Sequence, residues 1–305
     1  MNRKVKQILL AVFCLLFGLK TSAAIYVVHD TVESSVRALT FKLSQLLPSG
    51  TSLAPVRLSS FMKNLSLLKQ EDVLIAVGAE NFRQICASVN TGVVIAIFIG
   101  KEEYLKAQSK CSVSSSGVFS GAPLDKRLAL LEAIWFDRKP LAVIYSDNLL
   151  VDEQAMQKEA RQYGFEFIFQ KTELDRLSIL KSINFVLEES SVIFSLVDTD
   201  MYKDGVAQDI LKLLFRKQQV MIGPSYAFVR SGSMFAIYSD TSAKLEVLVE
   251  YITRWNEYGV MPDATYPNKL RVSFNPYLLK SNGVVPPSSS YLREKYGLCS
   301  EERCE

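Results

Sequence analysis

In this chain of 305 residues, polar, aromatic and cationic side chains follow the ends of the apolar runs. Side chains of these types can bind a ligand through hydrogen bonds, charge and stacking. The richest group lies between the apolar runs 220–222 and 234–238, in a short loop. Ligands of open α/β sheets bind outside the carboxyl ends of the strands. We therefore expect eight residues at such ends to contact a ligand: His29, Ser120, Asp147, Asp198, Asp200, Ser225, Tyr226 and Arg230.

The chemistry expected of these residues is binding. Arg230 could hold a carboxylate through two parallel hydrogen bonds, or it could be a lobe-bridging or solvated arginine. Tyr226 offers a flat wall for stacking, and Asp147 offers a hydrogen-bond acceptor. Asp198 and Asp200 could face a cleft as a carboxylate pair, or one of them could cap the next helix.

Signatures of common enzymes do not occur in the sequence. His29 is the single histidine, which excludes zinc motifs with two histidines such as H-E-x-x-H. The chain has no Walker lysine motif, no G-x-S-x-G elbow before a helix and no G-x-G-x-x-G after a strand. A serine hydrolase would have to use His29, which is more simply a helix cap or a ligand contact. We expect a protein that is not an enzyme, with no cofactor and no metal site.

The first 24 residues have the pattern of a secretory signal peptide. Three basic residues precede an apolar run of twelve, 8–19, and Ser22 and Ala24 fit the small-x-small cleavage rule before Ile25. Twelve apolar residues are too few to span a bilayer, which needs about 20. We therefore expect export to the periplasm through a cleaved signal peptide.

Cleavage changes the charge of the chain. The full sequence has a net charge of +3, and residues 1–24 carry four basic residues and no acid, so the mature chain has 3 − 4 = −1. A nucleic-acid-binding protein would need a surviving basic face, and we expect no nucleic-acid partner. No later run is long enough for a transmembrane helix, so we expect no membrane insertion of the mature chain.

Four cysteines remain after cleavage: Cys86, Cys111, Cys299 and Cys304. An oxidising compartment permits disulfides, and four cysteines allow three connectivities. Closeness in sequence favours Cys86–Cys111 and Cys299–Cys304. A zinc site is the alternative, but the cysteines do not have CxxC spacing.

Continuous apolar runs alternate with amphipathic helical segments along the chain. This order is typical of an α/β fold in which helices cover both faces of a mostly parallel sheet. The alternation stops at the polar residues 137–140 and then restarts at 141. We therefore expect two successive α/β lobes.

Two stretches, together with the order of elements, resemble the type I periplasmic substrate-binding proteins of ABC transporters. The stretches are 119–131, continued by 141–146, and 223–239. The resemblance is to a poorly characterised transport-associated subfamily that includes tryptophan-binding members, and it covers residues 25–286. It implies two lobes, each a mostly parallel sheet flanked by helices, joined by three hinge crossovers.

Carried onto this chain, the resemblance also implies the domain boundaries. The expected parts are a signal peptide at 1–24, a first lobe at 25–139 plus 238–262, a second lobe at 140–237 plus 263–290, and a C-terminal tail at 291–305.

The resemblance implies a soluble, monomeric periplasmic protein that closes on a small organic molecule and presents it to the membrane permease of an ABC-type uptake system. A ligand with an anionic group and an apolar or cationic part fits the expected site. Residues 77–79 and 99–100 stand where relatives often carry threonine-containing ligand loops. This departure motivates an alternative, an exported sensor or accessory interaction protein with a degenerate cleft.

Overall fold

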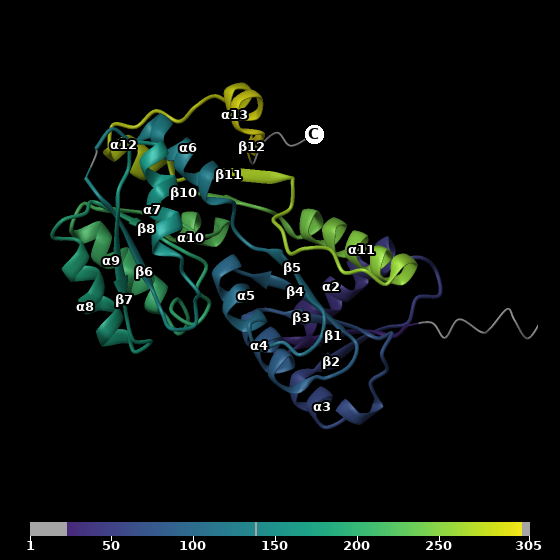
Figure 1. The fold of residues 1–305 in the computed structure, drawn as a ribbon. Coiled ribbons are helices and arrows are strands. Elements are labelled where there is room, and N and C mark those ends of the chain that lie inside the picture. Colours follow the sequence, from purple (N-terminus) through teal and green to yellow (C-terminus); the bar gives the residue numbers. More distant parts are fainter. Residues whose placement is uncertain (1–22, 138, 301–305) are drawn as a thin grey trace, which may run out of the picture.

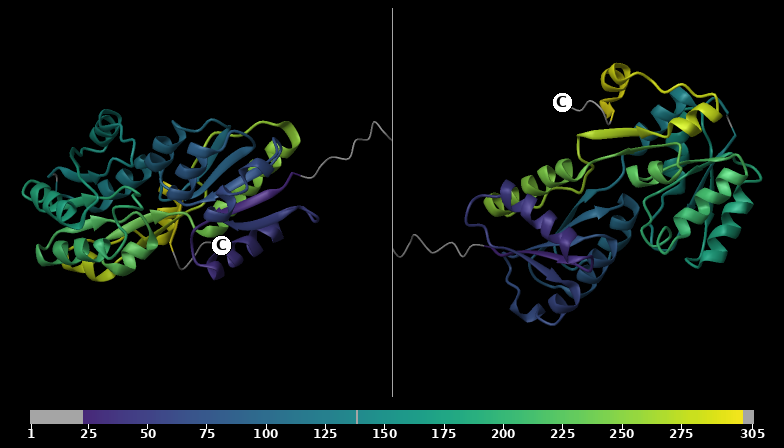
Figure 2. Two further views of the ribbon diagram at one scale, coloured as in Figure 1. Left: turned by 90° about the horizontal axis from the view of Figure 1, so that it is seen from below. Right: turned by 180° about the vertical axis from the view of Figure 1, so that it is seen from behind.

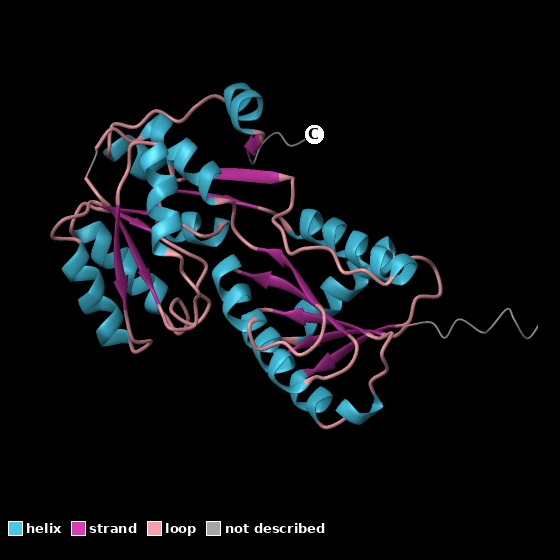
Figure 3. Ribbon diagram, viewed as in Figure 1, coloured by secondary structure: helices cyan, strands magenta, loops and turns pink. Residues whose placement is uncertain are grey.

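The computed structural model describes residues 23–137 and 139–300, which form two α/β lobes (Figure 1). One lobe contains a five-stranded sheet in the order β2-β1-β3-β4-β5, and the other contains a seven-stranded sheet in the order β12-β11-β10-β9-β8-β6-β7. Helices flank both sheets (Figure 3), and apolar clusters lie on both faces of each. The predicted two-lobed α/β architecture is confirmed.

The first lobe alternates strands and helices along residues 25–119. Its strands are β1 (Ile25–His29), β2 (Leu53–Arg57), β3 (Val73–Val77), β4 (Val93–Ile99) and β5 (Ser115–Phe119). Its helices in this part are α2 (Glu33–Leu46), α3 (Leu58–Met62), the short 3-10 helix η1 (Leu65–Leu67), α4 (Ala79–Ser88) and α5 (Lys101–Gln108). The strands pair in parallel, and β3 is buried along its whole length, as parallel sheets covered on both faces require.

The second lobe has a mostly parallel sheet with one antiparallel pair. Its strands are β6 (Leu141–Tyr145), β7 (Phe167–Lys171), β8 (Val192–Phe194), β9 (Val220–Ile222), β10 (Phe235–Tyr238), β11 (Leu270–Phe274) and β12 (Leu298–Ser300). Its helices are α6 (Leu124–Ile134), α7 (Glu153–Gln162), α8 (Arg176–Val186), α9 (Val206–Arg216), α10 (Tyr226–Ser231), α12 (Pro276–Ser281) and α13 (Ser289–Tyr296). Only β10 and β11 pair antiparallel among the described strands of this sheet.

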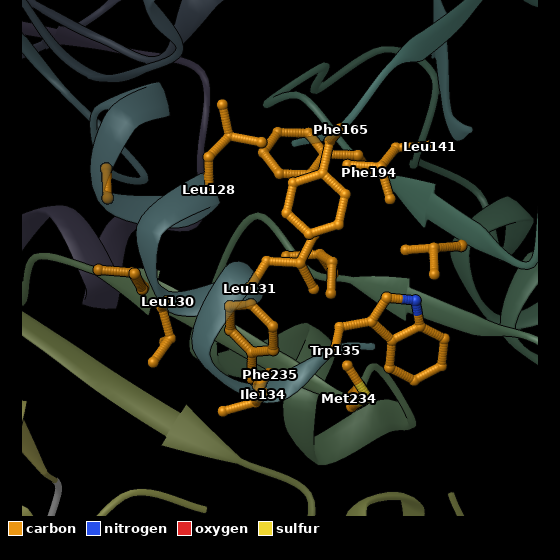
Figure 4. Packing of buried hydrophobic residues seen from close by; sticks show 14 of the residues in the cluster. Leu128, Leu130, Leu131, Ile134, Trp135, Leu141, Phe165, Phe194, Met234 and Phe235 are labelled. Atoms are coloured by element: carbon orange, nitrogen blue, oxygen red, sulfur yellow. The ribbon is translucent and has the colours of Figure 1, made fainter. Parts of the chain in front are cut away.

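Helix α6 packs on the second sheet, which differs from the predicted lobe boundary after Lys139. Leu128 and Leu131 of this helix share an apolar cluster with Phe194 of β8 and Phe235 of β10 (Figure 4). The chain therefore first crosses between the lobes at 120–123. A helical pattern in sequence reveals that a helix has a buried face, but it does not reveal which sheet covers that face.

The other two crossings flank helix α11 (Thr241–Tyr258), which packs beside α2 on the first sheet (Figures 1 and 2). The chain leaves β10 at 239–240 and returns along 259–269. On the return, Thr265 forms a parallel bridge to Val118 of β5. Three segments thus connect the lobes.

The expected C-terminal tail is part of the second lobe as far as it is described. Leu292 of α13 is buried against that lobe's core, and β12 extends the sheet by pairing in parallel with β11. The sequence did not predict this strand, because residues 285–305 are mostly polar and the strand has only three residues. Such a short apolar run cannot be recognised in a sequence.

Cys86 of α4 and Cys111, which follows α5, form the predicted disulfide. A crosslink that closes a loop of this length stabilises a fold by about 3 kcal/mol. The other predicted pair joins Cys299 of β12 to Cys304, which lies outside the described residues, so that pairing stays a prediction.

The predicted signal peptide, 1–24, lies outside the described residues except for its last two positions. Across 23–137 and 139–300, every helix is too short or too polar to cross a membrane.

Candidate functional site

A cavity of about 410 Å³ lies between the two lobes, beside the crossing segment 120–123. The first lobe contributes the start of α5. The second contributes α6, α7 and the residues that follow β8 and β9, and the third crossing contributes Tyr266. The volume falls within the usual range for small-molecule sites, roughly 300–1,000 Å³. Because both lobes form its walls, opening and closing of the lobes must change this cavity.

A second hollow of about 470 Å³ lies around the start of α2 and is lined by the first lobe and Thr241 of α11. The second lobe does not contribute to it. The inter-lobe cavity is therefore the better candidate for a site coupled to lobe movement.

The inter-lobe cavity combines an apolar wall with charged groups. Its larger apolar side chains are Leu105, Leu124, Leu150, Met156, Leu196 and Val197. Its acids are Glu102, Asp125, Asp152 and Glu159, and its bases are Lys101 and Arg127. Such a lining suits a molecule with both charged and apolar parts.

Arg127 of α6 is the most deeply buried charge in this lining, with 6% of its surface exposed. Its Nη2 donates hydrogen bonds to the carbonyl oxygens of Ser195 at 2.7 Å and Ile222 at 3.5 Å. The guanidinium carbon lies 4.0 Å from the centre of the Phe194 ring. Burial lowers the pKa of Arg127 to about 10, and the nearby Tyr266 and Glu102 oppose that effect, so Arg127 stays charged at neutral pH.

Two of the four acids in the cavity lining have partners at helix starts. Asp152 caps α7 and accepts a hydrogen bond from the Ala155 amide at 2.9 Å. Glu159 accepts one from the backbone of Asp125 in the first turn of α6, although burial is the main influence and raises its pKa. Glu102 differs, because burial raises the pKa of its carboxyl group and the only hydrogen bond acting on it comes from its own backbone.

Val197 of the second lobe packs closely against Gly100 of the first lobe and Gly121 of the first crossing. A Cβ atom added to Gly100, at the end of β4, would lie 2.7 Å from the Val197 Cβ, and one added to Gly121 would lie 3.3 Å from its Cγ2. Only glycine at position 100 therefore allows this close approach, because a real side chain would collide with Val197. The second lobe thus inserts one side chain into a notch in the first.

Polar contacts beside this notch join the lobes directly. Arg83 of α4 forms an ion pair of 2.9 Å with Asp200, which also accepts a hydrogen bond from the Asn148 side chain at 2.6 Å. The Glu103 carboxylate accepts hydrogen bonds from Gly100 N at 2.8 Å and Thr199 N at 2.7 Å, one from each lobe. The protein's own groups therefore hold the two lobes in contact.

The electrostatics of these contacts follow from their burial. Burial raises the pKa of Glu103 to about 7, and the hydrogen bonds from the Gly100 and Thr199 amides only partly oppose it. Burial also acts to raise the pKa of Asp200, but hydrogen bonds and charges from Arg83 and Lys203 outweigh it, and the pKa is lowered.

The predicted site residues fall into several places. Ser120 lines the inter-lobe cavity. Asp200 forms the inter-lobe contact, and Asp198 lies next to it, buried, where its carboxylate accepts hydrogen bonds from the Ser146 hydroxyl at 2.7 Å and Met201 N at 3.1 Å. Burial raises the pKa of Asp198. Asp198 therefore supports the strand-end loop. Neither acid caps the next helix, α9, because its N-cap is Gly205 and no side chain caps it.

The other predicted residues do not line this cavity. His29 is buried at the end of β1, and Asp147 is exposed and ion-paired with Lys171 of its own lobe. Ser225 precedes α10, a short helix where the sequence suggested only a loop, and Tyr226 stacks on Tyr238 with ring centres 5.8 Å apart. Arg230 is exposed in the last turn of α10.

Sequence reasoning missed Arg127, Glu102, Glu103 and Arg83 because it considered only residues at strand ends. One signal was readable. Arg127 lies three residues after Leu124 and four before Leu131, so it shares the apolar face of α6. A cation on the buried face of a helix needs a partner in the interior, and that requirement could have indicated Arg127.

A metal centre is not formed by the described residues, because none of their His, Cys, Asp and Glu side chains gather in a group of three or more that could hold an ion.

Comparison with known proteins identifies the fold. No family model matches the chain, and no curated protein matches its sequence. A conserved domain protein from Vibrio cholerae O1 biovar El Tor is similar in structure, with a TM-score of 0.67, 12% identity, and coverage of 90% of this chain and 99% of that one. An ABC domain from Streptococcus pneumonia in complex with L-Trp also gives 0.67, with 13% identity over 90% and 98% of the two chains.

An ABC transporter periplasmic solute-binding protein from Actinobacillus succinogenes with bound D-allose gives a TM-score of 0.51, with 11% identity over 85% of this chain and 99% of that one. Similar solved structures thus include ABC periplasmic solute-binding proteins, and the chain has their type I two-lobed fold. The relatives differ in what they bind, so this likeness does not identify a ligand for the chain.

Proposed function

We propose that the chain is a periplasmic solute-binding protein of an ABC-type uptake system, which binds a small organic molecule between its lobes and presents the closed form to a membrane permease. The observation that carries this proposal is the inter-lobe cavity of about 410 Å³, walled by both lobes. A solute held there contacts both lobes at once, so it favours the closed state over the open one. Solved structures of the same fold include an ABC domain in complex with L-Trp and a periplasmic solute-binding protein with bound D-allose.

Export through residues 1–24 and binding as a monomer belong to the same proposal. The signal-peptide pattern supports export, and the disulfide between Cys86 and Cys111 is consistent with an oxidising compartment.

Thermal unfolding in the presence of a metabolite library tests this function. A ligand that binds only the folded protein adds about 2.7 kcal/mol of stability at 100 times its Kd, so a true solute should raise the Tm by several degrees. If saturating sugars, amino acids, organic acids and amines all leave the Tm unchanged, uptake binding is contradicted.

A second function, an exported sensor or accessory interaction protein, draws support from Val197. This side chain packs closely against Gly100 and Gly121, and an ion pair and hydrogen bonds of the protein's own groups join the lobes. A partner protein captured equally by the wild type and by a variant with a blocked cavity would favour this second function.

A further inference from the structure

Strand β7 is an outer edge of the second sheet, and it differs from the other edge strands of the described sheets. In the first sheet, Pro55 removes a backbone donor from the edge strand β2, and the backbone of Thr265 pairs with the other edge strand, β5. In the second sheet, the opposite edge strand β12 has only three residues. Proline, shortness and a covering segment are the usual protections of a sheet edge. Strand β7 has five residues and none of these protections, so a further strand can pair with it.

The hydrogen bonds of β7 to β6 show which backbone groups remain on its outer side. The Glu166 carbonyl oxygen accepts from β6 at 2.7 Å, and the Thr172 N–H donates to β6 at 3.0 Å. Backbone groups alternate in direction along a strand. Those of Phe167, Phe169 and Lys171 therefore point away from β6, to the open side of the sheet.

Two side chains use part of this open side. Gln157 Oε1 accepts a hydrogen bond from Phe167 N at 2.8 Å, and Gln170 Nε2 donates to the Lys171 carbonyl oxygen at 2.6 Å. The Phe167 carbonyl, both backbone groups of Phe169 and the Lys171 N–H have no hydrogen-bond partner within residues 23–137 and 139–300. Two donors and two acceptors in this order are what one extended peptide segment pairs with.

An open hollow of about 740 Å³ lies beside these groups, between β7 and α7. Phe167 and Phe169 line it, with ring centres 5.6 Å apart. A strand paired with β7 would place its side chains opposite these two residues on the same face of the sheet. Apolar side chains at two alternate positions of the added strand would therefore pack on the two rings.

The charges around the hollow favour an acidic residue in the added strand. Glu153 in the lining accepts a hydrogen bond from the Tyr145 hydroxyl, and Arg161 lies 4.0 Å from the Glu166 carboxylate. Lys158, the third charged residue of the lining, forms no ion pair within the described parts of the chain. One base is thus left without an opposite charge.

We propose that β7 is a docking site for an extended segment of a partner protein, which adds a strand to the second sheet. The segment carries apolar side chains at two alternate positions and an acidic residue that reaches Lys158. Its main-chain hydrogen bonds supply affinity, and its side chains in the hollow supply specificity. This inference goes beyond solute binding, because different residues of α7 line the hollow and the inter-lobe cavity.

A random peptide library displayed on phage and selected on the purified protein is the first probe. The selection should enrich peptides that have two apolar residues separated by one residue, together with an aspartate or glutamate. The best peptide is then synthesised with single N-methyl groups along its backbone, and its affinity is measured by fluorescence polarisation. Only alternate amides of an added strand face β7, so N-methylation should weaken binding at least about fivefold at alternate positions and less than about twofold between them.

Two pairs of variants locate the bound peptide. Lys171 is exposed and ion-paired with Asp147, and both Lys171→Pro and Lys171→Ala lose that pair. Only Lys171→Pro also loses the outward N–H, which the pairing with β6 does not use, so it should bind the peptide at least about fivefold more weakly than Lys171→Ala. Lys158→Glu should weaken an acidic peptide about three- to tenfold at low salt, whereas Lys181→Glu, at an exposed position of α8, should not.

The proposal is overturned if the selection enriches no peptide, if the N-methyl effects do not alternate, or if Lys171→Pro and Lys171→Ala bind the peptide equally. A second copy of the chain is the rival occupant of the edge. Sedimentation that shows a dimer of the wild type and of Lys171→Ala, but a monomer of Lys171→Pro, would also overturn the proposal. Each of these results leaves solute binding in the inter-lobe cavity untouched.

Discussion

Glu103 is the residue at which the two lobes share a single carboxylate. One of its oxygens accepts from Gly100 N in the first lobe and the other accepts from Thr199 N in the second. It is 5% exposed, and burial raises its pKa to about 7, with Asp198 adding a smaller effect in the same direction. The contact between the lobes therefore includes a carboxyl group whose pKa lies near neutral pH.

The sign of the resulting pH effect follows from this pKa. An acid whose folded-state pKa lies above the ordinary 4.5 stabilises the fold most below 4.5, and this contribution is lost as the pH rises through about 7. Between pH 5 and pH 8, the free energy of unfolding of the wild type should fall by about 2–3 kcal/mol more than that of Glu103→Gln. Urea unfolding at both pH values measures the difference, with Glu188→Gln as the control. Equal pH dependence in the wild type and Glu103→Gln would contradict the account.

Arg127 shows what kind of site residue escapes sequence reasoning. Its helical spacing placed it on the buried face of α6, but the sequence could not show that β8 and β9 end beside it. Strand-end positions were predictable because the apolar runs are continuous. Which of those ends meet across the lobes depends on three-dimensional contacts of residues that are far apart in sequence, such as Asp200 and Arg83.

At the scale of elements, the end of β4 and the loop after β8 decide how closely the lobes approach. Gly100 directly follows β4, and Val197 lies in the loop after β8. The Val197 side chain packs against Gly100. The ion pair from α4 to Asp200 lies beside this contact. The fit needs no ligand, so closure combines the protein's own contacts with whatever the cavity binds.

Gly100→Ala should shift the protein toward an open arrangement. The added Cβ would meet the Cβ and the carbonyl oxygen of Val197, each at 2.7 Å, and overpacking of this kind costs about 1–3 kcal/mol. Position 100 has a φ of −74°, which alanine adopts freely, so the cost is confined to closure. Small-angle X-ray scattering should show a larger radius of gyration than for the wild type or for Ser109→Ala at the other end of α5. An unchanged radius would mean that this contact does not control closure.

The same elements mark the limits of prediction from sequence. Alternation of apolar runs and helices was enough to predict two α/β lobes, because each run is long enough to cross a covered sheet. The assignment of α6 failed because its amphipathic face fits either sheet equally well. Strand β12 was missed because its three residues, Leu298–Ser300, are too few to show a recognisable apolar pattern.

At the scale of the whole molecule, the cavity lies beside the segments that connect the two lobes. A movement of the lobes therefore changes the contacts that a ligand makes there. Segment 120–123 lines the cavity, and Tyr266 reaches it from the third crossing. A solute there therefore touches both lobes and two of the segments that join them. This arrangement is the physical basis for closure by ligand.

The substitution Ala155→Trp should block the cavity and leave the rest of the fold unchanged. Ala155 is exposed on α7 and lines the cavity, so an indole ring at this position can fill the space without disturbing a core. Gln154→Trp, at the neighbouring exposed position outside the cavity lining, is the matched control.

Native mass spectrometry of these proteins, exported and purified without denaturation, tests the central claim most directly. The account predicts that the wild type and Gln154→Trp carry a bound small molecule of one defined mass. It predicts that Ala155→Trp carries none and that its Tm lies within about 2 °C of that of wild-type protein freed of its ligand. A bound molecule that persists in Ala155→Trp, or wild-type protein that neither carries a small molecule nor takes one up from a periplasmic extract, would contradict the account.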